Sequence, residues 1–237
     1  MTFDWSTYTG NVDWLPRRTL FMTRHGSHAY GTSTPTSDVD LRGICVAPRA
    51  YQLGFLHSVR IVEQKVPDLA VFELREFFRQ AVDGAAPVIE MLFTDPSDHL
   101  VRTPLMDRLF AARHRFLSTK LRHTFRGFAF ANLKRMQSAH ERGEVGGYGK
   151  RACHVVRLMR MCREILTRGE VIVRRPDAEE LLAIRGGAWT YEEVCAWAER
   201  EDAALAELPT SLPREVDRGA LDALCVDMIA ASLEPGA

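Results

Sequence analysis

Asp38 and Asp40 are separated by one residue, at the start of a segment, 39–46, that has the composition of a β-strand. Side chains two positions apart in a strand point to the same face, so the spacing predicts two carboxylates side by side. Such carboxylates repel and raise each other's pKa unless a cation lies between them. Mg²⁺ prefers oxygen ligands and phosphates, and two such ions can hold both oxygens of a phosphoryl displacement. The pair is a candidate metal site for Mg²⁺, with Mn²⁺ as the alternative.

A second motif, Gly26-Ser27, follows a predicted strand at 20–23 and precedes a predicted helical turn at 28–31. Glycine lets a phosphate approach the backbone, and the amides of the turn and the Ser27 hydroxyl can donate to it. Either motif alone is common in turns and loops. In this order, with ten residues between Ser27 and Asp38, they predict a site that binds a triphosphate on one side and metal on the other.

The hydrophobic pattern divides the chain near residue 100. Strands are predicted at 20–23, 39–46, 59–62 and 69–72, and from Leu74 apolar residues follow helical spacing. A further helix opens at Pro87, and a turn at 95–98 precedes the expected boundary. Beyond it we predict helices, with a glycine-rich break at 142–149 and a strand only at 171–173. The helices are expected at 104–117, 120–140, 150–168, 177–184, 190–205 and 218–233, with a capping box at Thr190 and Glu193. The expected fold is α+β, with a catalytic domain at 1–100 and a helical domain at 101–237.

Charge is unevenly distributed although the chain has 31 basic and 31 acidic residues. The span 101–175 carries 18 Lys or Arg against 5 Asp or Glu, and the span 176–237 carries 4 against 14. A basic stretch of this kind attracts a polyanion such as nucleic acid. It can equally pair with the acidic tail as a solvated helix face. The sequence leaves both interpretations open.

Other broad classes are disfavoured. The five cysteines are odd in number and form no C-x-x-C pair, so neither disulfides nor a zinc site is expected. No apolar run reaches the roughly 18 residues of a membrane span. The first residues are polar and acidic rather than those of a signal peptide, so we expect a cytoplasmic protein.

The string from Gly26 to Gly43 resembles the signature of the DNA polymerase β nucleotidyltransferase superfamily. With its intervening loop it is most similar to a group of predicted nucleotidyltransferases that includes polymerase-like proteins associated with bacterial RNA repair ligases. The resemblance continues in 72–77, 150–157 and 175–185, and thus extends over about residues 20 to 205. The chain departs from the group at 85–86, where Ala-Ala replaces Gly-Asn, and at 147–149, where Gly-Tyr-Gly replaces Tyr-Asp-Thr.

The resemblance implies a small palm-like mixed sheet and a metal-dependent enzyme. It would transfer a nucleoside monophosphate from a nucleoside triphosphate (NTP), with ATP as one candidate, to a hydroxyl group and release pyrophosphate. The acceptor it implies is an RNA 3′ end. A protein or small-molecule acceptor is the alternative, as is a catalytically silent module that binds nucleotide or RNA. The intact pair of aspartates argues against the silent module.

The resemblance also assigns residues. Asp38 and Asp40 would bind metal and act in catalysis, and Gly26, Ser27 and Arg42 would bind nucleotide. Lys150, His154 and Arg157 lie at i, i+4 and i+7 of a predicted helix and share one face. Lys150 and His154 on this basic face are expected to reach the triphosphate, unless the face is only a solvated stripe.

The superfamily usually adds a third acid from a neighbouring strand, as a metal ligand or as the acceptor of the hydroxyl proton. Glu63, Asp68 and Glu73 are the candidates in this chain. We favour Asp68, because it precedes the strand at 69–72 as Asp38 precedes its own strand. Glu73 is the second candidate, because it lies inside the motif at 72–77 that resembles the family. For either residue, capping of a helix or strand end is the plain alternative.

Overall fold

The computed structural model describes residues 3–143 and 148–233, so residues 144–147 of the glycine-rich break lie outside it. Its centre is a five-stranded mixed sheet with the strand order β3-β4-β2-β1-β5. β2 and β4 are parallel, and the other neighbours are antiparallel. The strands are β1 (Thr19–His25), β2 (Asp40–Cys45), β3 (Ile61–Gln64), β4 (Leu69–Glu73) and β5 (His99–Arg102). The predicted α+β class is confirmed.

Eleven α-helices of the described residues surround this sheet. They are α1 (Leu15–Arg18), α2 (Gly26–Tyr30), α3 (Arg49–Leu53), α4 (Leu74–Val82), α5 (Ala86–Met91), α6 (Pro104–Ala112), α7 (Lys120–Glu141), α8 (Tyr148–Arg168), α9 (Ala178–Arg185), α10 (Tyr191–Glu207) and α11 (Arg218–Leu233). The helices predicted beyond residue 100 are confirmed, except that the first divides into α6 and a 3-10 turn, Arg113–Phe116. The capping box of Thr190 and Glu193 is confirmed as well.

One strand prediction was wrong, and one strand was missed. The segment 171–173 pairs with no strand of the described residues; Val171 and Val173 are instead buried against the helices. β5 was not predicted. It exists as the partner of β1, where Phe21 pairs with Arg102 and Met22 with Val101. The hydrophobic pattern within a short segment does not indicate such a pairing between distant residues.

The two faces of the sheet bury different parts of the chain. Leu41, Leu69 and Val71 pack against the N-terminal segment, whereas Ile44 and Phe72 pack against the helices. Because side chains alternate along a strand, Asp40 lies on the same face as Ile44. The acidic edge of β2 is therefore turned toward the helical side of the molecule.

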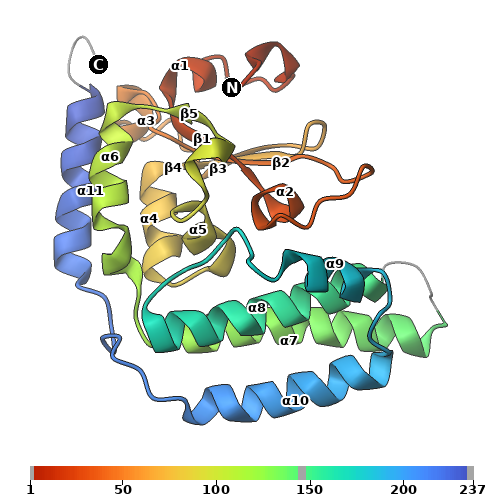
Figure 1. Ribbon diagram of the computed structural model, residues 1–237. Coiled ribbons are helices and arrows are strands. Elements are labelled where there is room, and N and C mark those ends of the chain that lie inside the picture. The colour runs from red at the N-terminus through yellow and green to blue at the C-terminus, as the bar shows by residue number, and fades with distance from the viewer. Residues whose placement is uncertain (1–2, 144–147, 234–237) are drawn as a thin grey trace.

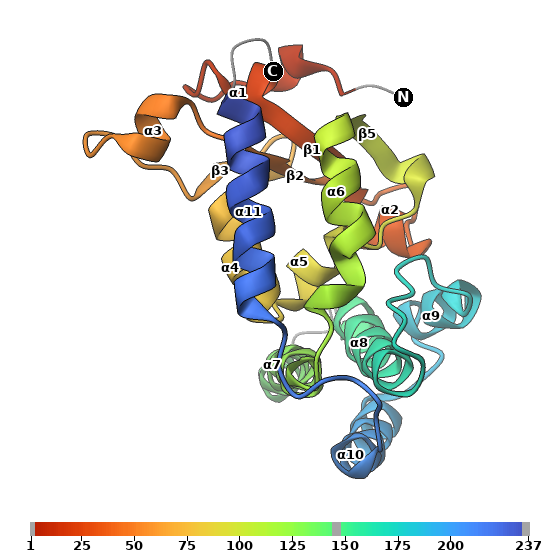
Figure 2. The same cartoon turned by 90° about the vertical axis from the view of Figure 1, so that its left-hand side faces the viewer.

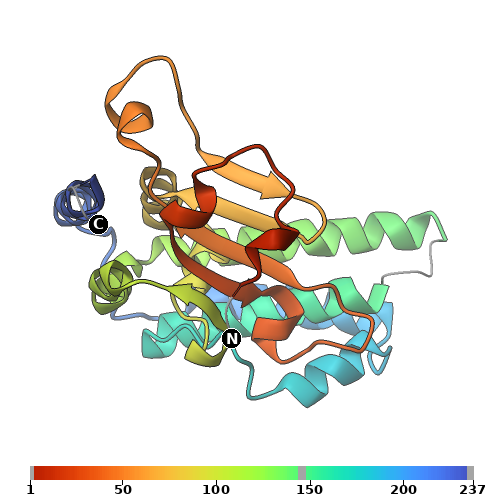
Figure 3. The same cartoon turned by 90° about the horizontal axis from the view of Figure 1, so that it is seen from above.

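The helices form layers below and beside the sheet. α4 and α5 lie directly under it, and α7 and α8 run side by side beneath them with α10 below (Figure 1). α6 and α11 stand at one end, where α11 contacts both α4 and α6 (Figure 2). From above, the N-terminal segment crosses the sheet (Figure 3). The predicted domain boundary near residue 100 lies within β5, and the division into two domains stays a prediction.

Within the described ranges, no helix is both long enough and apolar enough to cross a membrane. All five cysteines are free, and four of them are buried.

Candidate active site

Parallel pairing of β2 with β4 brings acidic residues together at one edge of the sheet. Asp40 is the first residue of β2 and pairs with His25, the last residue of β1. Leu41 pairs with Leu69, and the Leu41 amide donates to the carbonyl of Asp68 over 2.7 Å. Because parallel strands begin at the same edge, Asp40 and Asp68 lie beside each other. The exposed Asp38 precedes them on the loop that leads into β2.

The charges at this edge are only partly compensated. Burial raises the pKa of Asp40, and the carboxylate of Asp68 raises it further, while Arg42 and Lys150 oppose the shift. Arg42 itself donates to Asp68 Oδ1 over 2.9 Å. Among the described residues no three acidic, His or Cys side chains already converge as a complete metal cage. Neighbouring carboxylates such as those of Asp40 and Asp68 nevertheless fit a cation whose remaining ligands come from phosphate oxygens.

Gly26 joins the two sequence motifs. It begins α2 with φ +61°, a conformation that L side chains rarely adopt. A Cβ at residue 26 would also overlap Oδ2 of Asp40. Glycine is therefore required here on two counts, and the Gly-Ser turn lies directly against the acidic edge. At the other end of α2, Gly31 closes the helix in the left-handed conformation.

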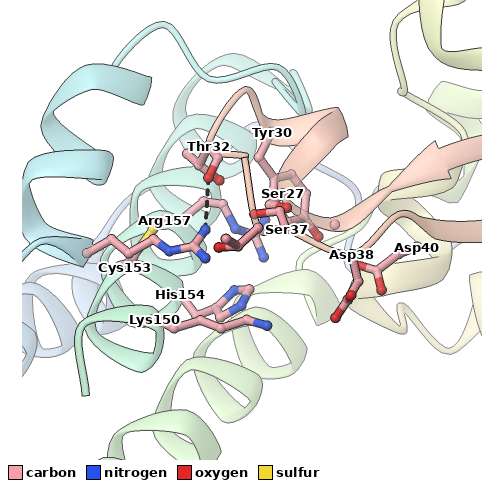
Figure 4. A pocket seen from close by; sticks show the side chains of 13 residues that line it. Ser27, Tyr30, Thr32, Ser37, Asp38, Asp40, Lys150, Cys153, His154 and Arg157 are labelled. Carbon is pink, nitrogen blue, oxygen red and sulfur yellow. Dashed lines mark hydrogen bonds between the residues drawn. The ribbon is translucent and has the colours of Figure 1, made fainter. Parts of the chain in front are cut away.

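A pocket of about 160 Å³ opens between the turn, the acidic loop and α8. Lys150 and His154 project from α8 on one side, and Lys150 extends toward Asp38 and Asp40 on the other (Figure 4). The predicted residues that line the pocket are Gly26, Ser27, Asp38, Asp40, Lys150 and His154.

This arrangement of a Gly-Ser turn against paired aspartates is accompanied by a family match. A family model described as the RNA repair pathway DNA polymerase beta family matches residues 9–211. The chain belongs to this family. The resemblance inferred from the sequence is thereby confirmed.

Two individual proteins are also similar to this family member. Over 101 residues it is 34% identical to an uncharacterised 38.9 kDa protein of Enterobacteria phage T4, from the nrdC–mobD intergenic region. That match covers 38% of the chain and 30% of the phage protein, so the chain matches less than a third of its relative's length. A solved nucleotidyltransferase-like protein from Exiguobacterium sibiricum 255-15 aligns with 91% of the chain and 69% of its own chain, at 14% identity and a TM-score of 0.26.

The structure separates the three candidates for the third acid. Asp68 lies beside Asp40, whereas Glu73 lies at the opposite end of β4, where it pairs with Cys45. Four residues of strand, about 13 Å, separate Glu73 from Leu69. Glu73 is buried and caps α4 by accepting from the amide of Arg75 and from Gln52. Glu63 is exposed on β3, which β4 separates from β2.

The basic face expected on α8 is not a uniform stripe in this family member. Arg157 is 2% exposed, and its guanidinium donates to Glu90 over 2.6 Å while stacking on the ring of Tyr30. Tyr30 donates to the other oxygen of Glu90 over 2.5 Å. Burial, reinforced by Arg157, lowers the pKa of His154 to about 4, so His154 is neutral at pH 7. Of the three residues on this face, only Lys150 is exposed.

The acidic tail neutralises part of the basic span. Arg126 pairs with Asp202, Arg163 pairs with Glu201, and Arg160 pairs with residues of α9 and the turn before it. Lys134 and Arg135 on α7, by contrast, are exposed and form no ion pair within the described part of the chain. Pairing with the acidic tail is thus confirmed for part of the basic span, and attraction of a polyanion by the remaining exposed residues stays a prediction.

Sequence reasoning missed Glu90 and Arg185. Arg185 is the last residue of α9, lines the pocket and donates to the carbonyl of Thr32 over 3.0 Å. Arg185 is the last residue of the segment 175–185 that resembles the family, and this position could have marked it as a site residue. Glu90 is a single acid among Val88, Ile89 and Met91, a pattern that indicates a buried charge with a partner.

Proposed function

We propose that this protein is a metal-dependent nucleotidyltransferase that transfers a nucleoside monophosphate from an NTP to a hydroxyl group of RNA. The observation that carries the proposal is the contact of Gly26 with Asp40, because the Gly-Ser turn and the acidic edge meet at one pocket, which supports binding of phosphate and metal there. Membership of an RNA repair polymerase family supports the chemistry.

Asp38 and Asp40, with Asp68, are the residues that would hold Mg²⁺ or Mn²⁺. The bound cation would supply charge neutralisation on the phosphates and on the attacking and leaving oxygens. The acceptor oxygen forms a bond to the α-phosphorus, and the bond from that phosphorus to the α,β-bridging oxygen breaks, so that pyrophosphate leaves. The proton of the attacking hydroxyl passes to a carboxylate, for which Asp68 is the candidate beside Asp40.

The nucleotide is bound by groups on both sides of the pocket. Ser27 and the amides at the start of α2 donate to phosphate oxygens, and Lys150 approaches from α8. A volume of about 160 Å³ is below the roughly 300–1,000 Å³ of pockets that enclose a whole drug-sized ligand. The pocket therefore fits the phosphate end of an NTP, with the nucleoside outside it.

The acceptor is proposed to be an RNA 3′ end that approaches along α7. Thr124 and Leu121 of α7 lie against Gly84, and the His25 ring hydrogen-bonds to the backbone of Pro87. The segment 84–87, which includes the first residues of α5, therefore contacts both α7 and the end of β1.

Phe128 and Arg135 continue the α7 face that begins at Thr124, since helical positions three or four apart share a face. Phe128 is 37% exposed and Arg135 is exposed. An exposed aromatic ring on the same helix face as a cation suits the stacked bases and phosphates of a single strand.

The test is incubation with each α-labelled NTP, Mg²⁺ and RNA that carries a free 3′ hydroxyl. We expect label in RNA, and none with Asp38→Asn or Asp40→Asn, whose melting temperatures should match or exceed that of wild type because mutual repulsion is removed. Label in protein or in a small molecule instead of RNA would show that this other molecule is the acceptor. Nucleotide binding with no turnover under any of these conditions would favour the silent module and overturn the proposal.

A further inference from the structure

The packing of α8 on α9 places two cations at one pocket. A Cβ at Gly149 would overlap the carbonyl oxygen of Arg185, so the backbone of α9 lies directly against the first turn of α8. Lys150 follows Gly149 in the chain, and both Lys150 and Arg185 line the pocket. A glycine at 149 therefore permits an approach of the two helices that brings Arg185 to the same pocket as Lys150.

These two cations are available to a ligand. Arg157, the third cation of the wall, already pairs with Glu90. Neither Lys150 nor Arg185 forms an ion pair within residues 3–143 and 148–233. Arg185 donates a hydrogen bond from one nitrogen to the carbonyl of Thr32, which leaves other donors of its guanidinium for an anion. The pocket also holds an orphaned donor, because Nε of the buried Arg157 has no partner there.

The two cations lie at different depths relative to the acidic edge. Lys150 extends toward Asp38 and Asp40, and it affects the pKa of Asp40. Thr32, with the arginine hydrogen-bonded to it, lies across the pocket from the aspartates, with Ser27 and Ser37 between (Figure 4). A triphosphate whose α-phosphate lies at the aspartates therefore extends past Ser27 and Lys150 toward Arg185.

From this arrangement we infer that Arg185 recognises the terminal phosphate of the NTP, and that Gly149 allows the backbone approach that positions it. The inference rests on the proposed function, because it takes the α-phosphate to lie at Asp38 and Asp40. Arginine suits this role because its planar fork can donate two hydrogen bonds to one phosphate. The site would then discriminate nucleoside triphosphates from diphosphates through one side chain.

The experiment measures equilibrium binding of the four ribonucleoside triphosphates and their diphosphates, with Mg²⁺ and without acceptor. Arg185→Ala should weaken binding of the preferred triphosphate by about tenfold or more, the loss expected for a charged hydrogen bond, and leave the diphosphate unchanged. Arg185→Lys should retain part of the preference, because it keeps the charge and loses the fork. Gly149→Ala should lower the ratio of triphosphate affinity to diphosphate affinity, because the added methyl group displaces α9. Arg168→Ala, which removes an exposed arginine at the end of α8, is the matched control and should bind as wild type does.

Equal weakening of triphosphate and diphosphate by Arg185→Ala, or no weakening, would overturn the inference. If Arg185→Ala does not fold, as judged by thermal melting, Arg185→Lys takes its place. Its ratio of triphosphate affinity to diphosphate affinity should then lie below that of wild type, and a wild-type ratio would overturn the inference. The proposed function can fail separately. A wild-type protein that shows the Arg185-dependent preference and transfers nothing would disprove catalysis alone. A wild-type protein that transfers nucleotide while Arg185→Ala keeps the full preference for triphosphate would disprove only this inference.

Discussion

Glu90 accepts a 2.6 Å hydrogen bond from Arg157, and both side chains are only 2% exposed. This ion pair ties α5, under the sheet, to α8, which carries Lys150. Burial alone would raise the pKa of Glu90, but Arg157 and the neighbouring His25 and Tyr30 hold it below its usual value. The pair thus keeps its charge inside the protein and fixes the helix that supplies one wall of the pocket.

Removing one partner of this pair should be costly. Glu90→Leu or Arg157→Leu leaves a buried charge without its partner, and we expect each to lower the free energy of unfolding by about 3–5 kcal/mol. Urea unfolding measures this. The double variant Glu90→Leu/Arg157→Leu should lose less than the two single losses combined. Asp107→Ala, which breaks the exposed pair with Arg102, should cost at most about 1 kcal/mol. Additive losses in the double variant would show that the two residues act independently.

Gly26→Ala should abolish nucleotidyl transfer. The new methyl group would overlap Asp40, and φ +61° is strained for alanine. Gly127→Ala is the matched control, since it adds the same methyl group to an exposed position of α7 with no atom within 4 Å. It should retain activity and gain about 0.5–1 kcal/mol of stability. Transfer rates and melting curves of both variants test this, and an active Gly26→Ala enzyme would disprove the proposed contact of turn and metal edge.

Asp68→Ala should lower turnover more than nucleotide binding, because its carboxylate lies beside Asp40. Glu73→Ala should instead cost about 0.5–2 kcal/mol of stability through loss of the α4 cap, with turnover per folded molecule retained. Steady-state kinetics combined with urea unfolding separates the two effects. A normal Asp68→Ala enzyme together with an inactive Glu73→Ala enzyme would move the role to Glu73.

RNA affinity should depend on Lys134 and Arg135. Phosphate contacts give a log–log salt slope of roughly −0.7 per contact for a single strand. Lys134→Ala/Arg135→Ala should therefore weaken RNA binding and flatten this slope while sparing the KM for NTP. Phe128→Ala should weaken binding without changing the slope, since stacking releases no counterions.

The control for this experiment is Arg108→Ala/Arg115→Ala, which removes the same charge from exposed positions of α6 and the turn after it. It should leave RNA binding unchanged. The opposite result would be a loss of stability in Lys134→Ala/Arg135→Ala, together with weak RNA binding that depends little on salt. In that case the basic span serves only to neutralise the acidic tail.

Stability should fall in mild acid. Burial lowers the pKa of His25 and of His154 to about 4, against 6.5 for an ordinary histidine. Between pH 6.5 and pH 4 the unfolded chain therefore binds protons that the folded protein does not, so the free energy of unfolding decreases as pH falls, and above pH 6.5 these groups contribute no slope. His25→Gln and His154→Gln should each reduce the slope in this window, measured by urea unfolding at several pH values. Variants with the wild-type slope would contradict the assignment.

Local patterns in the sequence determined the Gly-Ser turn, the strand that follows Asp38 and begins at Asp40, and the helices beyond residue 100. Each depends on spacing within a few residues, because strand alternation, helical periodicity and capping are properties of short segments. The capping box at Thr190 is a case in which sequence and structure agree residue by residue.

Only the tertiary structure decided features that depend on which distant segments pair. Parallel pairing of β2 with β4 put Asp68 beside Asp40 and took Glu73 to the far end, although both residues flank the same strand. β5 forms a strand because its backbone pairs with β1 in antiparallel orientation. Arg157 and Arg185 shared similar sequence signals and both line the pocket, yet Arg157 is paired with Glu90, whereas Arg185 forms no ion pair within the described residues. These outcomes follow from contacts between residues far apart in the chain, whose partners local spacing does not specify.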